Sequence, residues 1–452
     1  MTYRLGWLVV LLLVATLCPP AHAQAPALTY AAVSDRSVRP YPPLPVLSGA
    51  GYQFTDPTSG SKMLRVTDAN TRPDFVGRLW ASPSSAETSA WNTDSTKFFV
   101  IGGGEVVPYR FDPATMTASR MGDPSNATGG LLLFFGGEPS FSFVDPDVLY
   151  GVDWAERNRM VAYRVSTATQ STVHDVQTCL PGAAVHEGNI SVTKGDQRLL
   201  DYVGGTAQGL DTYVYVYDRT LGCRWLNTQT GQVGGAWGPT GTYNGEAGWF
   251  MHNARILKNG KWARIVASSA STAGVYFWNI ETLDVIPCNI GLGPDFCGGH
   301  QVMGFDTVIN QRGLGDGLDF AIRPMRNPAA AGPLITPLLT PPSWGQDTHP
   351  SWNNVQADEK QPVCLAVYRA DNLVQRAWDG EIVCVETDGV ASTVWRFAHH
   401  RSQYLSFWDS PRANVSQDGR FALFASNWEL TLGIGPYGPR EDAFIVRLAP
   451  RP

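Results

Sequence analysis

A unit of about fifty residues recurs along most of this 452-residue chain, and it limits the possible folds more than any other feature. Each copy is a run of alternating apolar residues, a polar turn and a run of β-branched or aromatic residues, which is the pattern of a β-hairpin. Successive copies begin between 48 and 66 residues apart. The copies span residues 87–102, 138–152, 186–202, 252–268, 300–310, 349–368 and 411–426.

A second hairpin, with a turn rich in Asp, Thr or Gly, alternates with the first. Its copies span residues 54–68, 110–121, 164–176, 217–227, 279–288 and 385–397, and the copy expected near 318–330 is degenerate. Two hairpins per period supply four strands, which is the content of one β-propeller blade. Seven periods therefore predict an all-β fold, a seven-bladed β-propeller with four-stranded blades.

The order of the hairpins also predicts how the ring closes. The chain begins with an outer hairpin at 54–68 and ends with an inner hairpin followed by one more strand at 443–449. If the first hairpin completes the last blade, no sheet edge is left unpaired. A pair of β-sandwiches is the alternative fold, but it does not account for a period near fifty residues.

The first 23 residues are predicted to be a signal peptide. Arg4 precedes an apolar run, and Ala21, His22 and Ala23 form a small-x-small cleavage site. We therefore expect a secreted or periplasmic protein with an N-terminal arm over 24–53 and a propeller over 54–452. No later run reaches the roughly 18 apolar residues of a spanning helix, so we expect no stable membrane insertion.

The six cysteines that follow this segment suggest disulfides, because an exported protein meets an oxidising environment. Pairing in chain order is the simplest arrangement, although the sequence leaves others open. It would join Cys179 to Cys223, Cys288 to Cys297, and Cys364 to Cys384. No Cys/His spacing typical of a thiolate zinc site occurs.

The charges argue against a nucleic-acid partner. The chain has 34 Lys and Arg against 40 Asp and Glu, and the cations are scattered. Phosphate binding requires a concentrated basic face.

Histidines recur at one position of the repeat. When the inner hairpins are aligned on their turns, His252 and His349 immediately precede the inner strand, His300 opens its copy, and His186 lies within two residues of the same point. In a propeller, these positions surround one mouth of the central channel. We expect these four side chains to line a rim, although any single imidazole there could instead bond the backbone of a neighbouring blade.

A histidine rim could bind a divalent metal or supply a general base. Neutral imidazoles suit Mn, Zn, Ni or Cu, with Gln346 a possible oxygen ligand beside His349. An imidazole is also a base near neutral pH. His399 and His400 could overhang the same rim from the loop that enters the last blade.

Cations, phenols and indoles accompany the histidines. An arginine can stabilise developing negative charge, a tyrosine can donate a proton, and a tryptophan can stack on a sugar, although a lone tryptophan commonly serves packing. The candidates are Arg255, Arg412, Tyr243, Tyr404, Trp344 and Trp408.

Together these features resemble the oligogalacturonate lyase-type propellers and the related ulvan lyases. The resemblance rests on the opening hairpin "DPTSG...MLRVTD", the final-blade stretch "SQDGRFALFASNW" and the histidine-lined face, and it covers most of the chain at the level of blade rhythm. Asp-Gly blade turns also occur in TolB-like and peptidase-associated propellers.

The resemblance implies a metal site and an active-site histidine. Oligogalacturonate lyases hold manganese with three histidines and a glutamine, and His300, Gln346 and His349 match part of that set. The family pattern has a further histidine where this chain has Ser351. Either His186 or His399 replaces it, or the metal is absent and the protein is nearer the ulvan lyases, which rely on His and Tyr. The expected cofactor is therefore one divalent ion, Mn, Zn or Ca, or none.

The function implied is that of a secreted polysaccharide lyase that cleaves a uronate-containing glycan by β-elimination. Its partner would be an acidic polysaccharide or oligosaccharide, and we expect a monomer. The predicted catalytic residues are His252, Tyr243, Tyr404, Arg255 and Arg412, and the predicted substrate-binding residues are His186, Trp344, Trp408 and Glu138.

Two other functions stay open. A propeller can bind glycan or protein without catalysis, since a fold alone implies no chemistry. A glycoside hydrolase would need paired carboxylates, for which Glu87 and Glu138 lie at the same phase of adjacent blades.

Overall fold

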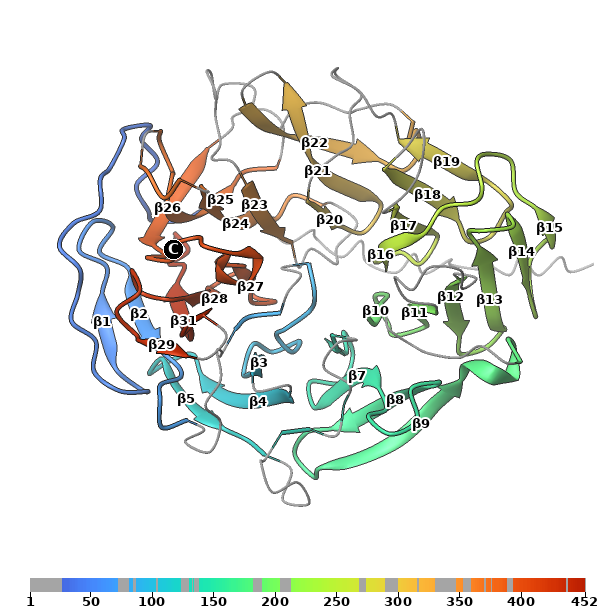
Figure 1. Ribbon diagram of the computed structural model, residues 1–452, viewed down its shortest axis with the longest axis horizontal. Helices are drawn as coiled ribbons and strands as arrows, with labels where there is room; N and C mark the ends of the chain where they lie inside the picture. Colours follow the sequence, from blue (N-terminus) through green and yellow to red (C-terminus); the bar gives the residue numbers. More distant parts are fainter. Residues whose placement is uncertain are drawn as a thin grey trace, which may run out of the picture.

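The computed structural model describes the chain between residues 27 and 451 with gaps. The described residues are 27–71, 81–83, 87–102, 105–122, 130–131, 133, 138–181, 189–203, 213–267, 274–288, 300–314, 317–329, 347–352, 359–369, 371–374, 376–387, 393–435 and 438–451. Their strands form antiparallel sheets arranged around a common axis as seven blades (Figure 1). The predicted all-β, seven-bladed propeller is confirmed.

The first three blades follow in chain order, each from its inner to its outer strand (Figure 1). The first contains β3 (Lys97–Gly102), β4 (Glu105–Asp112) and β5 (Thr117–Arg120). The second contains β6 (Ser140–Phe141), β7 (Val148–Val152), β8 (Arg159–Arg164) and β9 (Thr169–Asp175), followed by the 3-10 helix η2 (Val176–Thr178). The third contains β10 (Ser191–Val192), β11 (Arg198–Val203), β12 (Tyr213–Asp218), β13 (Gly222–Asn227), β14 (Gln232–Gly235) and β15 (Gly241–Thr242).

The next three blades continue around the ring. The fourth contains β16 (Met251–Ile256), β17 (Trp262–Ala267), β18 (Val275–Asn279) and β19 (Val285–Cys288). The fifth contains β20 (Gln301–Met303), β21 (Thr307–Leu314) and β22 (Gly317–Pro324). The sixth contains β23 (Asp347–Ser351), β24 (Val363–Tyr368), β25 (Glu381–Val385) and β26 (Val394–His399), and the 3-10 helix η3 (Phe407–Asp409) follows it.

The seventh blade joins the two ends of the chain. It contains β27 (Asn414–Val415), β28 (Phe421–Ser426), β31 (Asp442–Arg447), β2 (Lys62–Arg65) and β1 (Gln53–Thr55), and a separate hairpin pairs β29 (Ile434–Gly435) with β30 (Gly438–Pro439). Strand β2 pairs with β31, placing Leu64 opposite Ile445. The predicted closure of the ring by the N-terminal hairpin is therefore confirmed.

The predicted four strands hold for the second, fourth and sixth blades, while the other blades have three, five or six. In the first blade, the innermost position is represented by an isolated bridge between Trp91 and Phe98. In the third, the hairpin β14–β15 adds two outer strands. In the seventh, the N-terminal hairpin that closes the ring brings the total to five strands. The repeat thus fixes the number of blades, and local insertions vary the strand count.

The inner hairpins turn where the sequence places Asn-Gly and Asp-Gly. Gly260 adopts a φ of 77° and Gly419 a φ of 68°. Side chains with a Cβ rarely adopt this left-handed conformation, so glycine stabilises both turns.

The hydrophobic core lies between neighbouring blades. Phe98 of the first blade, Leu149 of the second and Phe421 of the seventh belong to one buried cluster. Every residue of β24 is buried, as expected for a strand covered on both faces. Each sheet is therefore held by the sheets beside it.

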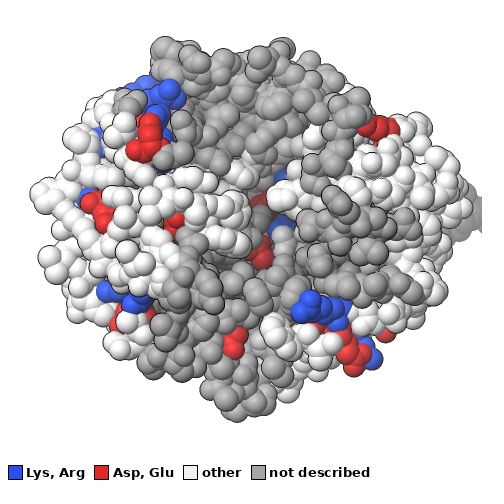
Figure 2. Space-filling view, viewed as in Figure 1, with Lys and Arg blue, Asp and Glu red and all other residues white. Residues whose placement is uncertain are grey.

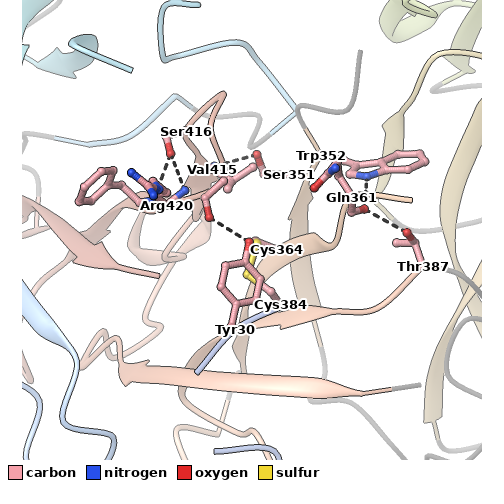
Figure 3. Close-up of a disulfide and its surroundings, with 12 residues drawn as sticks. Tyr30, Ser351, Trp352, Gln361, Cys364, Cys384, Thr387, Val415, Ser416 and Arg420 are labelled. Carbon is pink, nitrogen blue, oxygen red and sulfur yellow. Dashed lines mark hydrogen bonds between the residues drawn. A yellow bond between two sulfur atoms is a disulfide. The ribbon is translucent and has the colours of Figure 1, made fainter. Parts of the chain in front are cut away.

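Disulfides join strands and blades as predicted for two of the three pairs. Cys179 is bonded to Cys223, which links the second blade to the third. Cys364 and Cys384 are bonded directly across β24 and β25, with Cα atoms 4.0 Å apart, beside Tyr30 of the N-terminal arm (Figure 3). Cys288 is also disulfide-bonded, and its predicted partner Cys297 lies outside the described residues.

The N-terminal arm runs along the sixth and seventh blades. Tyr30 bridges Pro450, and Val33 bridges Arg396 of β26. The predicted signal peptide and most of the Pro-rich segment 327–345 lie outside the described residues. Within the described part of the chain, no helix has the length and apolar character needed to cross a membrane.

Candidate functional site

Three of the predicted histidines lie at the innermost strands of three consecutive blades. His252 belongs to β16, His300 directly precedes β20, and His349 belongs to β23. The rings of His300 and His349 stack with centroids 3.8 Å apart. The charge of His300 lowers the pKa of both His252 and His349, so the three imidazoles are electrostatically coupled. The fourth candidate, His186, lies outside the described residues.

A β-bulge presents His252. The pairing of β16 with β17 shifts register between Met251 and Asn253, so His252 is left outside the ladder. Bulges commonly re-aim a side chain beside a functional site. Met251 is buried in the core while the side chain of His252 is exposed. The bulge therefore turns an otherwise structural strand position into an accessible imidazole.

His349 is a buried, neutral imidazole. Burial lowers its pKa well below the ordinary value, and the charges of His300 and Arg412 lower it further. Its Nε2 atom has no hydrogen-bond partner among the described residues. The Nδ1 atom of the neighbouring His300 lies 2.7 Å from the carbonyl oxygen of Thr348, so Nδ1 donates and carries the proton.

Two tyrosines extend the stacked histidines into a row of four rings. Tyr368 lies 5.9 Å from the ring of His349, and Tyr404 lies 5.3 Å from the ring of Tyr368. The sequence pattern identified Tyr404 but missed Tyr368. The antiparallel hairpin brings the end of β24 beside the start of β23, where Tyr368 is paired with Asp347. A search of both ends of each inner hairpin would have found it.

Arg412 is a buried cation without a contacting carboxylate among the described residues. Its guanidinium lies 4.6 Å from the ring of Phe407 and 5.8 Å from that of Trp408, and it donates to the Phe407 carbonyl oxygen. Its Nε atom has no hydrogen-bond partner in the same part of the chain. Burial lowers the pKa of Arg412, and more distant acidic groups, Glu441 foremost, oppose this. We call the side chains of His252, His300, His349 and Arg412 the histidine mouth.

A buried ion network lies next to the histidine mouth. Glu87 accepts a hydrogen bond from Arg264 at 2.8 Å and lies 3.3 Å from Arg255 Nε. Arg255 also lies 3.8 Å from Glu138, which accepts a hydrogen bond from Thr88 at 3.2 Å. Acidic and basic atoms accordingly lie side by side in the central hollow (Figure 2).

This network changes the interpretation of Arg255, Glu87 and Glu138. The guanidinium of Arg255 contacts both carboxylates and also donates to the carbonyl oxygen of Asn189 at 3.0 Å. It is therefore a structural cation with its charge already matched. Both carboxylates are already engaged by Arg255, whereas a hydrolase needs a carboxyl pair directed at the substrate. The geometry does not support the hydrolase alternative.

Tyr243 does not join the other candidates. It directly follows β15, at the outer edge of the third blade (Figure 1). The ring is buried in the core with Trp249, and its hydroxyl donates to the carbonyl oxygen of Glu246. The predicted proton-donor role is therefore corrected to a packing role, since inter-blade packing holds this tyrosine in the core.

His399 and His400 are held by internal contacts. His399 lies 3.7 Å from carboxylate oxygens of both Asp56 and Glu381. His400 accepts a hydrogen bond from the backbone of Ser402 at 3.0 Å, and burial lowers its pKa to about 3. Neither replaces the missing metal ligand, because each has partners of its own.

The described residues fit a metal ion in part. His300 uses Nδ1 to donate to Thr348, so Nε2 is the atom that could bind a metal, and the buried Nε2 of His349 has no hydrogen-bond partner among the described residues. Neutral imidazole nitrogens of this kind are suitable ligands. Within the described segments no group of three His, Cys, Asp or Glu side chains could hold a metal. Gln346, Trp344 and His186 lie outside those segments.

If His252 acts as a general base, activity should remain high to a lower pH than an ordinary histidine would allow. Partial burial lowers the pKa of His252, and the charges of Arg264 and His300 add to this effect. A base with a lowered pKa stays deprotonated until the pH falls further. We therefore expect the acidic limb of kcat/KM to have an apparent pKa below 6.5. A limb above 6.5 would contradict His252 as the base.

The fold and the site define a class of protein: seven-bladed propellers that carry imidazoles and a buried guanidinium on their inner strands. The chain is similar in structure to a solved oligogalacturonate lyase in complex with manganese, with 13% identity, a TM-score of 0.56, and coverage of 89% of this chain and 98% of that chain. An oligogalacturonate lyase from Vibrio parahaemolyticus is 11% identical, with a TM-score of 0.55 and coverage of 88% and 96%.

No protein-family model and no curated protein sequence matches the chain. At these identities, the likeness to solved structures shows the fold. The resemblance to oligogalacturonate lyase-type propellers predicted from blade rhythm is therefore confirmed at that level.

Proposed function

We propose that the protein is a polysaccharide lyase that cleaves a uronate-containing glycan by β-elimination at the histidine mouth. The observation that carries this proposal is the environment of Arg412. Its guanidinium is buried and contacts no carboxylate among the described residues. Its charge helps to lower the pKa of the nearby His349. A buried cation that contacts no carboxylate in the described part of the chain is suited to binding an anionic substrate. A uronate carboxylate has the charge and the planar geometry to pair with it.

The first chemical requirement is a more acidic C5–H bond. Proton removal at C5 places charge on the adjacent carboxylate, and a cation there stabilises that charge. Arg412 is the residue we assign to this role, because the charge of Arg255 is already matched by Glu87 and Glu138. The low-dielectric surroundings that lower the pKa of Arg412 also strengthen its attraction for an anion.

The second requirement is a base and an acid. His252 is accessible, and its lowered pKa keeps it neutral at neutral pH, so it can accept the C5 proton. Tyr404, at the end of the ring row, can donate a proton to the leaving oxygen at C4. The bond between C4 and the leaving oxygen breaks. The products are one fragment with a new reducing end and one whose non-reducing terminal uronate has a C4–C5 double bond, and no water is consumed.

A divalent metal, where bound, would neutralise the uronate carboxylate together with Arg412. His300 and His349 would hold it through their Nε2 atoms, with Gln346 as the oxygen ligand proposed from the sequence. The manganese in the similar oligogalacturonate lyase supports this assignment.

We also propose that the chain is exported and acts as a monomer on acidic polysaccharide or oligosaccharide. The disulfides are consistent with an oxidising compartment. The scattered cations do not favour nucleic acid.

The test is the ultraviolet absorbance of unsaturated uronate, measured with wild-type protein on a panel of acidic polysaccharides. We expect Arg412→Met to lower kcat/KM by roughly 10²- to 10³-fold, the size of a lost oxyanion-stabilising group. The variant should remain folded, because Met keeps an apolar stem against Phe407 and Trp408, and its Tm checks this.

The matched control is Arg164→Met, which changes an exposed arginine on the outer surface and should leave the activity unchanged. Absence of an unsaturated product on every polysaccharide tested would overturn the lyase proposal.

A further inference from the structure

The loop between β26 and β27 presents large apolar side chains to solvent. Leu405 is 58% exposed, Phe407 48% and Trp408 49%. The rings of Phe407 and Trp408 pack edge to face with centroids 5.2 Å apart. Exposed apolar side chains grouped in this way commonly mark a binding surface.

The backbone of the loop is held by a carboxylate of its own and by a side chain of the neighbouring β24–β25 segment. The buried Asp409 carboxylate accepts hydrogen bonds from the backbone of Ser406 at 2.7 Å and of Leu405 at 3.2 Å. Asn372 accepts from the backbone of Tyr404 at 2.6 Å and donates to its carbonyl oxygen at 3.2 Å. The backbone that carries the two rings is thus held in place before any ligand arrives, which lowers the entropy cost of binding.

The aromatic pair is continuous with the histidine mouth. The guanidinium of Arg412 lies 4.6 Å from the Phe407 ring and 5.8 Å from the Trp408 ring. Arg412 lies just before the inner strand β27, whose backbone donates to the hydroxyl of Ser351 at 3.0 Å on β23, the strand that contains His349. A ligand bound on the two rings would therefore lie next to Arg412, the residue that we propose binds the uronate carboxylate.

We infer that Phe407 and Trp408 form a sugar-stacking subsite that holds a pyranose ring of the glycan next to the ring bound at the histidine mouth. Pyranose rings offer flat C–H faces that pack on indole and phenyl rings, while their hydroxyl groups stay in water. A rigid two-ring platform beside a buried cation suits an acidic glycan longer than the unit that is cleaved. The inference rests on the proposed function, because that function places the cleaved sugar ring at the histidine mouth and the next ring of the glycan on Phe407 and Trp408.

The test compares Phe407→Ala and Trp408→Ala with Trp154→Ala, a matched control whose indole is 45% exposed on an outer turn of the second blade. On a cleaved polysaccharide, each subsite variant should raise KM by about three- to tenfold, the size of one aromatic contact. The rise should be larger on the polymer than on the shortest oligosaccharide cleaved, and kcat should change little. Equal KM values for all three variants would overturn the subsite.

A second measurement separates failure of the subsite from failure of the lyase proposal. Retardation in native gels that contain polygalacturonate, alginate or hyaluronate reports binding without turnover. Retardation that Trp408→Ala weakens and Trp154→Ala does not would support the subsite even if no polymer is cleaved. The subsite would be overturned if none of the three gels retarded the protein. It would also be overturned if Trp408→Ala changed the oligomeric state and left glycan binding unchanged.

Discussion

His252→Ala is expected to lower kcat/KM by roughly 10²- to 10⁴-fold while leaving the thermal unfolding curve unchanged. The loss is large because His252 is the only exposed imidazole among the described residues of the mouth, His300 being half-buried and His349 buried. Stability should be kept because the side chain is exposed and lies outside the β16–β17 ladder. The measurement is steady-state kinetics on the cleaved polysaccharide, with circular dichroism to follow unfolding.

The matched control is His174→Ala. His174 lies on β9 of the second blade, where its ring stacks on Tyr217 at 4.2 Å, and it has no place in the proposed chemistry. Its removal should leave kcat/KM within about twofold of wild type, in the range of a change remote from the site. Full activity in His252→Ala would remove the proposed base.

Asp442→Ala should have the largest effect on stability, a loss of about 3–5 kcal/mol in the free energy of unfolding. Asp442 is fully buried on β31 and accepts hydrogen bonds from Arg65 of β2 and from Arg440 at 2.6 Å. The ion pair therefore crosses the seam that closes the ring. Its removal leaves the buried Arg65 without its counter-charge at the point where the two chain ends meet.

The double variant Arg65→Met/Asp442→Leu tests this reason. Burial raises the pKa of Asp442 against the opposing charge of Arg65, so dehydrating the pair is costly. An apolar pair should therefore recover much of the stability that either single change loses. Asp145→Ala, which breaks a pair on the outer surface, should cost no more than about 1 kcal/mol. Equal losses in Asp442→Ala and Asp145→Ala would refute the role of the seam.

The architecture could be predicted because it depends on patterns that are local in the sequence. An Asn-Gly or Asp-Gly turn, as at Gly260 and Gly419, defines a hairpin whatever its neighbours are. Two hairpins per period then set the blade, and the phase of the first hairpin predicts the pairing of β2 with β31. Strand counts were less predictable, because the 66-residue interval between the third and fourth inner hairpins could hold a long loop as well as the added strands β14 and β15.

The candidate site could be predicted only for residues that share a repeat position. His252, His300 and His349 lie at corresponding points of consecutive inner strands, so the aligned repeat brings them together. Tyr368 lies at the opposite end of its hairpin and carries no such signal. Tyr243 was assigned by its distance along the chain from His252, and proximity in sequence did not bring it to the mouth.

By itself, the sequence determined a ring of seven hairpin-built blades and the phase at which imidazoles enter it, because backbone hydrogen bonding and turn conformation depend on neighbours a few residues apart. Only the tertiary structure decided which charges are matched. Glu87 meets Arg264 across 177 residues and Arg255 reaches both Glu87 and Glu138, whereas Arg412 meets no carboxylate among the described residues. Electrostatic compensation depends on distance in space and on burial, and neither is set until the blades pack around one axis.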